Sequence, residues 1–133
     1  MTTFPFELVA PERVLFSGEV DAVILPATEG EMTVLPGHAP TLTALKTGFL
    51  VLTDHQGHGQ RVLVRGGFAD IGPSGLTVLA ERAVPLQELT PEIIDREILQ
   101  AELAIDTAKD QASREAAENA ITQLREARVA LNY

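Results

Sequence analysis

The chain has 133 residues, a formal net charge of −9 and no cysteine. The length allows one compact domain or two very small ones, and the absence of cysteine excludes disulfides and thiolate chemistry. The ten Lys and Arg residues are scattered, which argues against nucleic acid and against an anionic lipid surface as partners. No apolar run approaches the roughly 20 residues of a membrane-spanning helix, and the first residues lack the pattern of a secretory signal. We therefore expect a protein that stays in the compartment where it is made.

The chain up to about residue 90 is predicted to form β-strands. Short apolar runs occur at 4–8, 14–16, 20–25, 32–35, 49–52, 62–64 and 76–80. Turn signals separate them at 17–18, 28–30, 36–37, 47–48, 57–59, 66–67 and 72–75. Many short runs divided by glycine-rich turns are typical of a sandwich or barrel of antiparallel strands.

The remaining residues are predicted to be helical, because neither Gly nor Pro occurs after Pro91. Thr90 can cap the helix, with Pro91 at its first position. Apolar residues then recur at helical spacing, namely Ile94, Ile98, Ala101, Ile105 and Ala108, and later Ala117, Ile121, Leu124 and Leu131. One helix of about 40 residues and a hairpin of two helices, capped at Asp110 or Ser113, both fit this period. We favour the hairpin, because a single helix would leave its apolar stripe in water.

The fold class predicted from these patterns is β + α. An N-terminal antiparallel β-sandwich over residues 1–88 precedes a C-terminal antiparallel two-helix hairpin over residues 89–133. The change in composition near residue 90 marks the expected domain boundary.

No residue pattern indicates catalysis. The chain has no phosphate-binding loop and no dinucleotide fingerprint. Ser17 and Ser74 fall in predicted turns and Ser113 in the helical part, without the partners of a nucleophile. The pair His55 and His58 fits a polar hairpin loop better than a zinc site, which needs three or four ligands. We therefore expect no catalytic, cofactor-binding or metal-binding residues.

One stretch is far more specific. Residues 16–40, FSGEVDAVILPATEGEMTVLPGHAP, resemble the signature region of the epsilon subunit family of F-type ATP synthases, equivalent to the mitochondrial delta subunit. The resemblance continues through residues 64–68 and 77–81 and covers most of 4–90. It implies a non-catalytic subunit of the rotor's central stalk, which couples the gamma subunit and the c-subunit ring to the catalytic head. It also implies a peripheral place on the cytoplasmic face of the bacterial inner membrane, with membrane association only through the complex.

The resemblance assigns two contact segments. The turn expected to face the c-subunit ring comprises Glu29, Gly30 and Glu31. The turn expected near the gamma subunit comprises Pro36, Gly37, His38, Ala39 and Pro40. Without the resemblance, the two glutamates would be interpreted as a solvated tip around a turn glycine.

The resemblance also gives the helical hairpin expected roles. In some members it reaches the alpha/beta catalytic head and blocks hydrolysis, and in some it binds ATP through a short motif. The nearest match, residues 105–110, has Lys109 where the motif has arginine and Asp110 where it has alanine. We therefore expect weak ATP binding or none.

Two other functions fit the composition. One is a metal-dependent small β-barrel enzyme that uses His38, His55 and His58. The other is a free-standing interaction module unrelated to the synthase.

Overall fold

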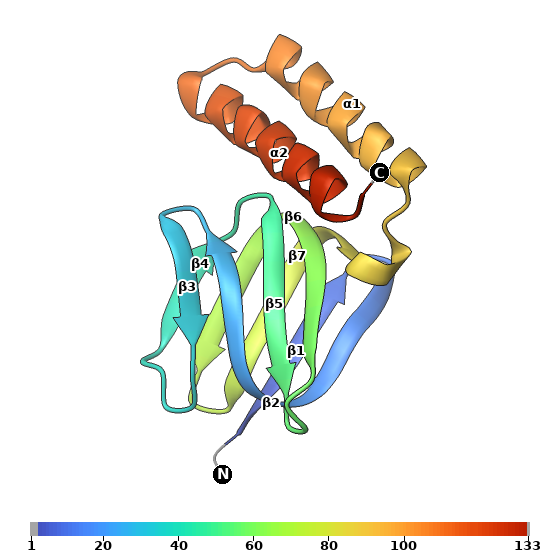
Figure 1. Cartoon of the computed structure of the whole chain (residues 1–133). Helices are drawn as coiled ribbons and strands as arrows, with labels where there is room; N and C mark the ends of the chain where they lie inside the picture. The colour runs from blue at the N-terminus through green and yellow to red at the C-terminus, as the bar shows by residue number, and fades with distance from the viewer. Residues whose placement is uncertain (1–2, 133) are drawn as a thin grey trace. The chain divides into compact units, whose positions relative to one another are not determined.

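The computed structural model describes residues 3–132 and has two compact units, one ending at Leu86 and the other beginning at Gln87. The first unit consists of strands and the second of two helices (Figure 1). This confirms the predicted fold class of a β-sandwich followed by a helical hairpin.

The first unit contains the strands β1 (Phe4–Ala10), β2 (Arg13–Ala27), β3 (Gly30–Val34), β4 (Thr41–Ala44), β5 (Gly48–Asp54), β6 (Gly59–Gly72) and β7 (Gly75–Pro85). Their order is β1-β7-β6-β5-β2-β3, with β4 beside β6 and a further pairing of β1 with β2. The pairing of β1 with β2 closes β1, β7, β6, β5 and β2 into a ring. The pairs are antiparallel except β1–β7, which is parallel. β1 and β7 are far apart in the sequence and no hairpin joins them, so they can pair in parallel.

Two predicted turns lie inside long strands, and these predictions were wrong. Ser17-Gly18 belongs to β2 and Gly66-Gly67 to β6, which have 15 and 14 residues. Gly67 has φ +113°, and a Cβ there would lie 2.1 Å from the carbonyl oxygen of Leu79. The glycine therefore permits a close approach of β6 to β7 rather than ending the strand.

One strand was absent from the predicted set. The four residues of β4 alternate Thr and Leu too briefly to form an apolar run. This strand is defined by its partner, because Thr41 to Ala44 pair with Ile71 to Phe68 of β6.

The core of the first unit is formed by inward-facing side chains of its strands. Its largest fully buried members include Phe6, Leu8, Leu25, Leu50 and Leu52. Phe6 also stacks obliquely on Phe16, with ring centroids 5.6 Å apart. Such a core fixes the strands, and hence the surface they carry, in one arrangement.

The short 3-10 helix η1 (Leu86–Glu88) spans the boundary between the units, and the second unit contains the helices α1 (Pro91–Thr107) and α2 (Gln111–Ala130). Thr90 caps α1, since its Oγ1 accepts a hydrogen bond from the backbone N–H of Ile93 at 3.2 Å. Asp110 caps α2 in the same way, accepting from Ser113 N–H at 2.7 Å. The chain therefore forms the favoured hairpin and not one long helix.

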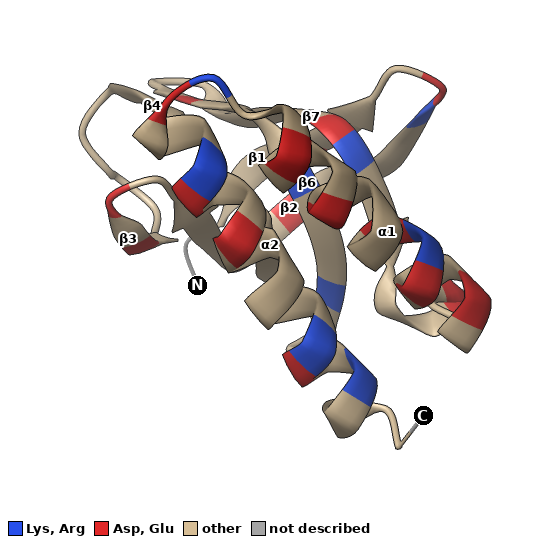
Figure 2. Cartoon of the chain, turned by 90° about the horizontal axis from the view of Figure 1, so that it is seen from above, with Lys and Arg blue, Asp and Glu red and all other residues tan. Residues whose placement is uncertain are grey.

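The helices meet through small side chains. Ala101, Ala120 and Ile121 form their apolar cluster, with Ile105 packed against it. An ion pair between Arg128 and Asp95 also joins α2 to α1. Residues 87–133 contain ten acidic and five basic residues, and Figure 2 shows acidic positions, in red, along both helices.

Candidate protein-docking surfaces

The predicted ring-facing residues form an exposed tip. Glu29, Gly30 and Glu31 lie at the hairpin turn between β2 and β3, where Ala27 pairs with Gly30. Gly30 has φ +127°, which L side chains rarely adopt, and both glutamates are exposed. The backbone N–H of Thr28 donates to the carbonyl of Ala44 at 3.1 Å, which holds the turn in place.

The predicted gamma-facing residues form a stiff segment after β3. His38 N–H donates to the carbonyl of Leu35 at 3.1 Å, and His38 Nδ1 lies 2.8 Å from the carbonyl oxygen of Ala39. Because a carbonyl oxygen only accepts, Nδ1 carries the proton in that bond. A pocket of about 390 Å³ lies here, bounded on one side by this segment and on the other by Ile71 to Leu76.

The two predicted segments lie at opposite ends of β3 (Figure 1). The strand has five residues, so its ends are about 13 Å apart. One small unit can therefore present the two segments to two different partners at once.

A third surface was not predicted. Five residues on the outer face of the sandwich are paired across neighbouring strands. Val14 pairs with Val9, and Val9 pairs with Leu79. Leu79 pairs with Phe68, and Phe68 pairs with Ala44. Paired residues share a face of a sheet, so these five form one line across β2, β1, β7, β6 and β4. We call them the outer apolar row.

Most of this row is open to solvent. Val14 is 59% exposed, and Phe68 and Leu79 are each 57% exposed. Leu42, two residues from Ala44 and so on the same face, is 71% exposed. A hollow of about 410 Å³ lies along the middle of the row, between Val9, Phe68 and Leu79. Aligned exposed apolar side chains of this kind indicate a site for another macromolecule.

Carboxylates border the outer apolar row on both sides. Glu7 and Asp70 pair with Thr77, which lies two residues before Leu79 and therefore on the same face. Glu81 lies two residues after Leu79 and helps to line the hollow. Arg13 and Arg82 lie near Glu81, so the border is acidic without a nearby cation only on the side of Glu7 and Asp70.

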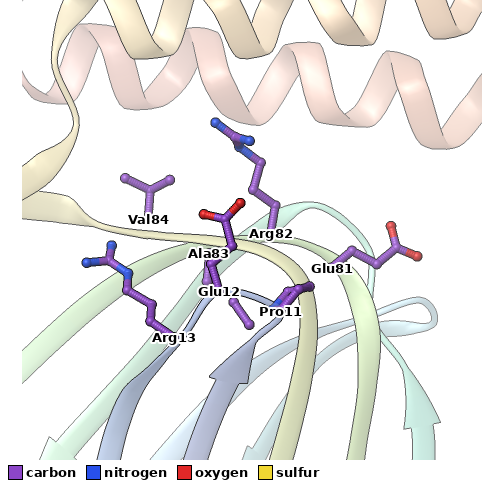
Figure 3. Close-up of a pocket in the computed structure, with 8 residues that line it drawn as sticks. Pro11, Glu12, Arg13, Glu81, Arg82, Ala83 and Val84 are labelled. Atoms are coloured by element: carbon purple, nitrogen blue, oxygen red, sulfur yellow. The ribbon is translucent and has the colours of Figure 1, made fainter.

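A pocket of about 250 Å³ lies where the β1–β2 turn meets β7. In Figure 3, the side chains of Arg13 and Arg82 project toward the same side, Glu12 lies between them and Glu81 points away. Two arginines and two glutamates leave the lining without net formal charge.

The histidines expected to act in a metal-dependent enzyme lie in loops. His55 and His58 lie in the β5–β6 loop, which Asp54 holds by accepting hydrogen bonds from the N–H groups of Gln56 and His58, both at 2.9 Å. The bond from His58 N–H is the main reason that the pKa of Asp54 lies below its usual value. Within residues 3–132, no group of three or more His, Asp and Glu side chains is arranged to hold a metal ion.

The β-unit decides the chain's family. Residues 3–86 match the family model for the beta-sandwich domain of the ATP synthase delta/epsilon chain. The chain belongs to the ATP synthase delta/epsilon family. The resemblance seen in the signature region is thereby confirmed.

Relatives extend this family match into the helices. The chain is 45% identical over 123 residues to the ATP synthase epsilon chain of Parvibaculum lavamentivorans, covering 92% of this chain and 93% of the relative. It is 49% identical over 109 residues to that of Rhizobium meliloti, covering 82% and 81%. Epsilon chains are non-catalytic subunits of the synthase, so the expectation of a subunit that does not act as an enzyme alone is confirmed.

Solved structures agree in fold. A chain of the Euglena gracilis mitochondrial ATP synthase, in a complex with OSCP, F1 and c-ring, matches with TM-score 0.73 and 26% identity, over 97% of this chain and 81% of that one. A chain of the Tetrahymena thermophila central stalk and c-ring matches with TM-score 0.71 over 95% and 96%, but at 11% identity it shows the fold alone. Among the helices described here, none is long and apolar enough to cross a membrane.

The sequence did contain a signal for the outer apolar row. The run Val78-Leu79-Ala80 is apolar at consecutive positions, whereas a strand with one solvated face alternates. Val78 is fully buried and Ala80 nearly so, while Leu79 points outward. An apolar residue at an outward position indicates a second face that another surface could bury.

Proposed function

We propose that this subunit belongs to the rotor's central stalk and holds the gamma subunit to the c-subunit ring, so that rotation reaches the catalytic head. The outer apolar row is the observation on which this proposal rests. Non-catalytic subunits act through the surfaces they bury. Of the five exposed large apolar residues in the described sandwich, all but Leu35 lie on this face, namely Val14, Leu42, Phe68 and Leu79.

The outer apolar row is the proposed gamma contact. Burying side chains such as Phe68 and Leu79 against a partner contributes about 25 cal/mol for each Å² of apolar area removed from water. Leu42 connects the row to Pro40, so the predicted Pro36–Pro40 segment and the row form one continuous surface. The two prolines keep that edge stiff, which lowers the ordering cost of binding.

The proposed ring contact is the Glu29–Gly30–Glu31 tip. Its carboxylates extend beyond the sheet, where polar or basic loops of a ring can meet them. Because the tip lies at the other end of β3 from Pro36–Pro40, both contacts can form together.

The proposed domains are residues 1–88 and 89–133. The hairpin is proposed to reach the alpha/beta head and to regulate hydrolysis there. Asp110 already uses its carboxylate to cap α2, and its charge disfavours a phosphate group nearby, so the ATP motif at 105–110 is proposed to bind weakly or not at all. The whole subunit is proposed to be peripheral on the cytoplasmic face of the inner membrane.

The gamma contact is tested with Phe68→Ser in the full chain. We expect at least a tenfold loss of affinity for purified gamma subunit by calorimetry, because a central aromatic anchor is lost (about 2 kcal/mol or more). Leu99→Ser, a change to an equally exposed leucine on α1, is the control and should bind normally. Equal affinities of the two variants would refute the proposed contact.

The ring contact is tested with Glu31→Lys. We expect a smaller membrane-bound fraction after mild detergent washing, with unchanged circular dichroism, because the exposed tip supports no core packing. Glu102→Lys makes the same charge change on α1. A membrane-bound fraction equal to that of the control would rule out Glu31 as a ring contact.

A further inference from the structure

We infer that the partner segment on the outer apolar row is an amphipathic helix whose apolar stripe is flanked by Lys and Arg on the side that faces Glu7 and Asp70. This inference rests on the proposed function, since it specifies what the gamma subunit must present to this face. It concerns the chemistry of the contact and not its existence.

The dimensions of the outer apolar row fit a helix. The row crosses five strands, and adjacent strands are about 4.8 Å apart, so its length is about 19 Å. An α-helix rises about 1.5 Å per residue, so about 13 residues cover the row. Such a helix presents apolar side chains at about every third or fourth position, in a stripe that the hollow between Phe68 and Leu79 can receive.

The acidic border sets the flanks of that helix. Along the strands, Glu7 and Asp70 lie two residues from the row on one side, and Glu81 lies two residues from it on the other. Two residues of strand span about 7 Å, which is comparable to the distance from the axis of a packed helix to its flanking side chains. Cations on the flank that faces Glu7 and Asp70 would therefore meet two carboxylates, whereas the flank near Glu81 also faces the pocket that Arg13 and Arg82 line.

The bordering line of paired residues contains no cation on the Glu7 side. It consists of Ser17, Glu7, Thr77, Asp70 and Leu42. An acidic partner would place its carboxylates next to Glu7 and Asp70, which is unfavourable because like charges repel. A neutral partner would leave these two charges unpaired beside an apolar contact, which is also unfavourable. Charge complementarity therefore selects a basic partner segment over a neutral or acidic one.

The test measures how salt affects binding of the full chain to purified gamma subunit. The variant Glu7→Gln/Asp70→Asn removes two border charges and leaves the apolar centre intact. We expect association roughly five- to tenfold weaker at low ionic strength, mainly through a slower on-rate, and a shallower loss of affinity as salt rises. The matched control, Glu102→Gln/Glu126→Gln, removes two exposed carboxylates of the helices and should keep the wild-type salt dependence.

The outcomes separate this inference from the proposed function. If Phe68→Ser abolishes binding but the border variant retains wild-type affinity and salt dependence, the basic-flanked helix is refuted while the contact stands. If Phe68→Ser binds gamma normally, the contact itself fails. Thermal melts of each variant, expected to match wild type because all these side chains are exposed, ensure that lost binding is not lost folding.

Discussion

The sandwich core and the cluster between the two helices are built from different kinds of side chain, although the second unit also buries Leu89, Ile94 and Leu124. The sandwich buries large residues, with Phe6, Leu8 and Leu50 at most 1% exposed. The hairpin's own cluster consists of two alanines and Ile121, with Ile105 at its edge. Because stabilisation grows with apolar area buried, the sandwich is the rigid part and the hairpin's helix–helix contact opens at lower cost. A subunit with one rigid and one readily opened part can hold a partner with the first and respond to conditions with the second.

The largest effect is expected from Leu50→Ala in the sandwich. Leu50 is fully buried, so its truncation leaves a cavity and should lower the free energy of unfolding by about 3–5 kcal/mol. Urea unfolding followed by circular dichroism measures this loss. Leu42→Ala removes the same atoms from an exposed site and should change the free energy by less than about 0.5 kcal/mol. A similar loss in both variants would contradict the account of the core.

A smaller loss is expected from Gly67→Ala, which tests the contact between β6 and β7. The new Cβ would meet the backbone of Leu79 in addition to the strain of a positive φ, so we expect a loss of about 2–3 kcal/mol. Gly57→Ala, at φ +82° with no atom near its Cβ, isolates the strain and should cost about 1 kcal/mol. If thermal unfolding shows the same loss of stability in both variants, β6 is not held close to β7.

The hairpin is probed by Ile121→Ala. This change removes the largest member of the helix–helix cluster, so opening should become easier by about 2 kcal/mol. Hydrogen exchange should accelerate roughly 30-fold for amides of α1 and α2, while amides of β5 keep their protection. Equal acceleration in both units would mean that the hairpin and the sandwich unfold together, and the contrast drawn above would be lost.

The smallest effect is expected from acid at the β5–β6 loop. The pKa of Asp54 is lowered, chiefly by its hydrogen bond from His58 N–H, so its carboxylate stabilises the folded loop above the ordinary aspartate pKa. That stabilisation is lost as pH falls through the lowered value in the folded state. NMR titration should show the Asp54 transition below the ordinary range, with the amides of Gln56 and His58 shifting together. An unshifted transition would remove the loop's dependence on this carboxylate.

Sequence patterns predicted the parts of the fold that depend on local chemistry. The cap at Thr90, the proline at position 91 and the turn around Gly30 follow from residue type and spacing. The long bent strands could not be predicted in this way. Gly66-Gly67 reads as a turn locally, and only the approach of β7 shows that the strand continues.

The residues of the candidate site also differ in whether the sequence alone could reveal them. The acidic tip and the Pro36–Pro40 segment are contiguous in sequence, so a resemblance can point to them. The outer apolar row takes single residues from five strands, and its members become neighbours only through register. Its carboxylate border is equally dispersed, so neither could be assembled before the pairing was known.

The continuity of β2 has a mechanical consequence. This one strand carries Val14 at its beginning and reaches Ala27, next to the acidic tip, at its end. A load applied between those two places acts along the axis of the strand. The ladders that β2 forms with β1, β3 and β5 then resist sliding as a group, whereas a load perpendicular to the strand would open them one after another. The sandwich is therefore stiffest along β2, between the outer apolar row and the acidic tip.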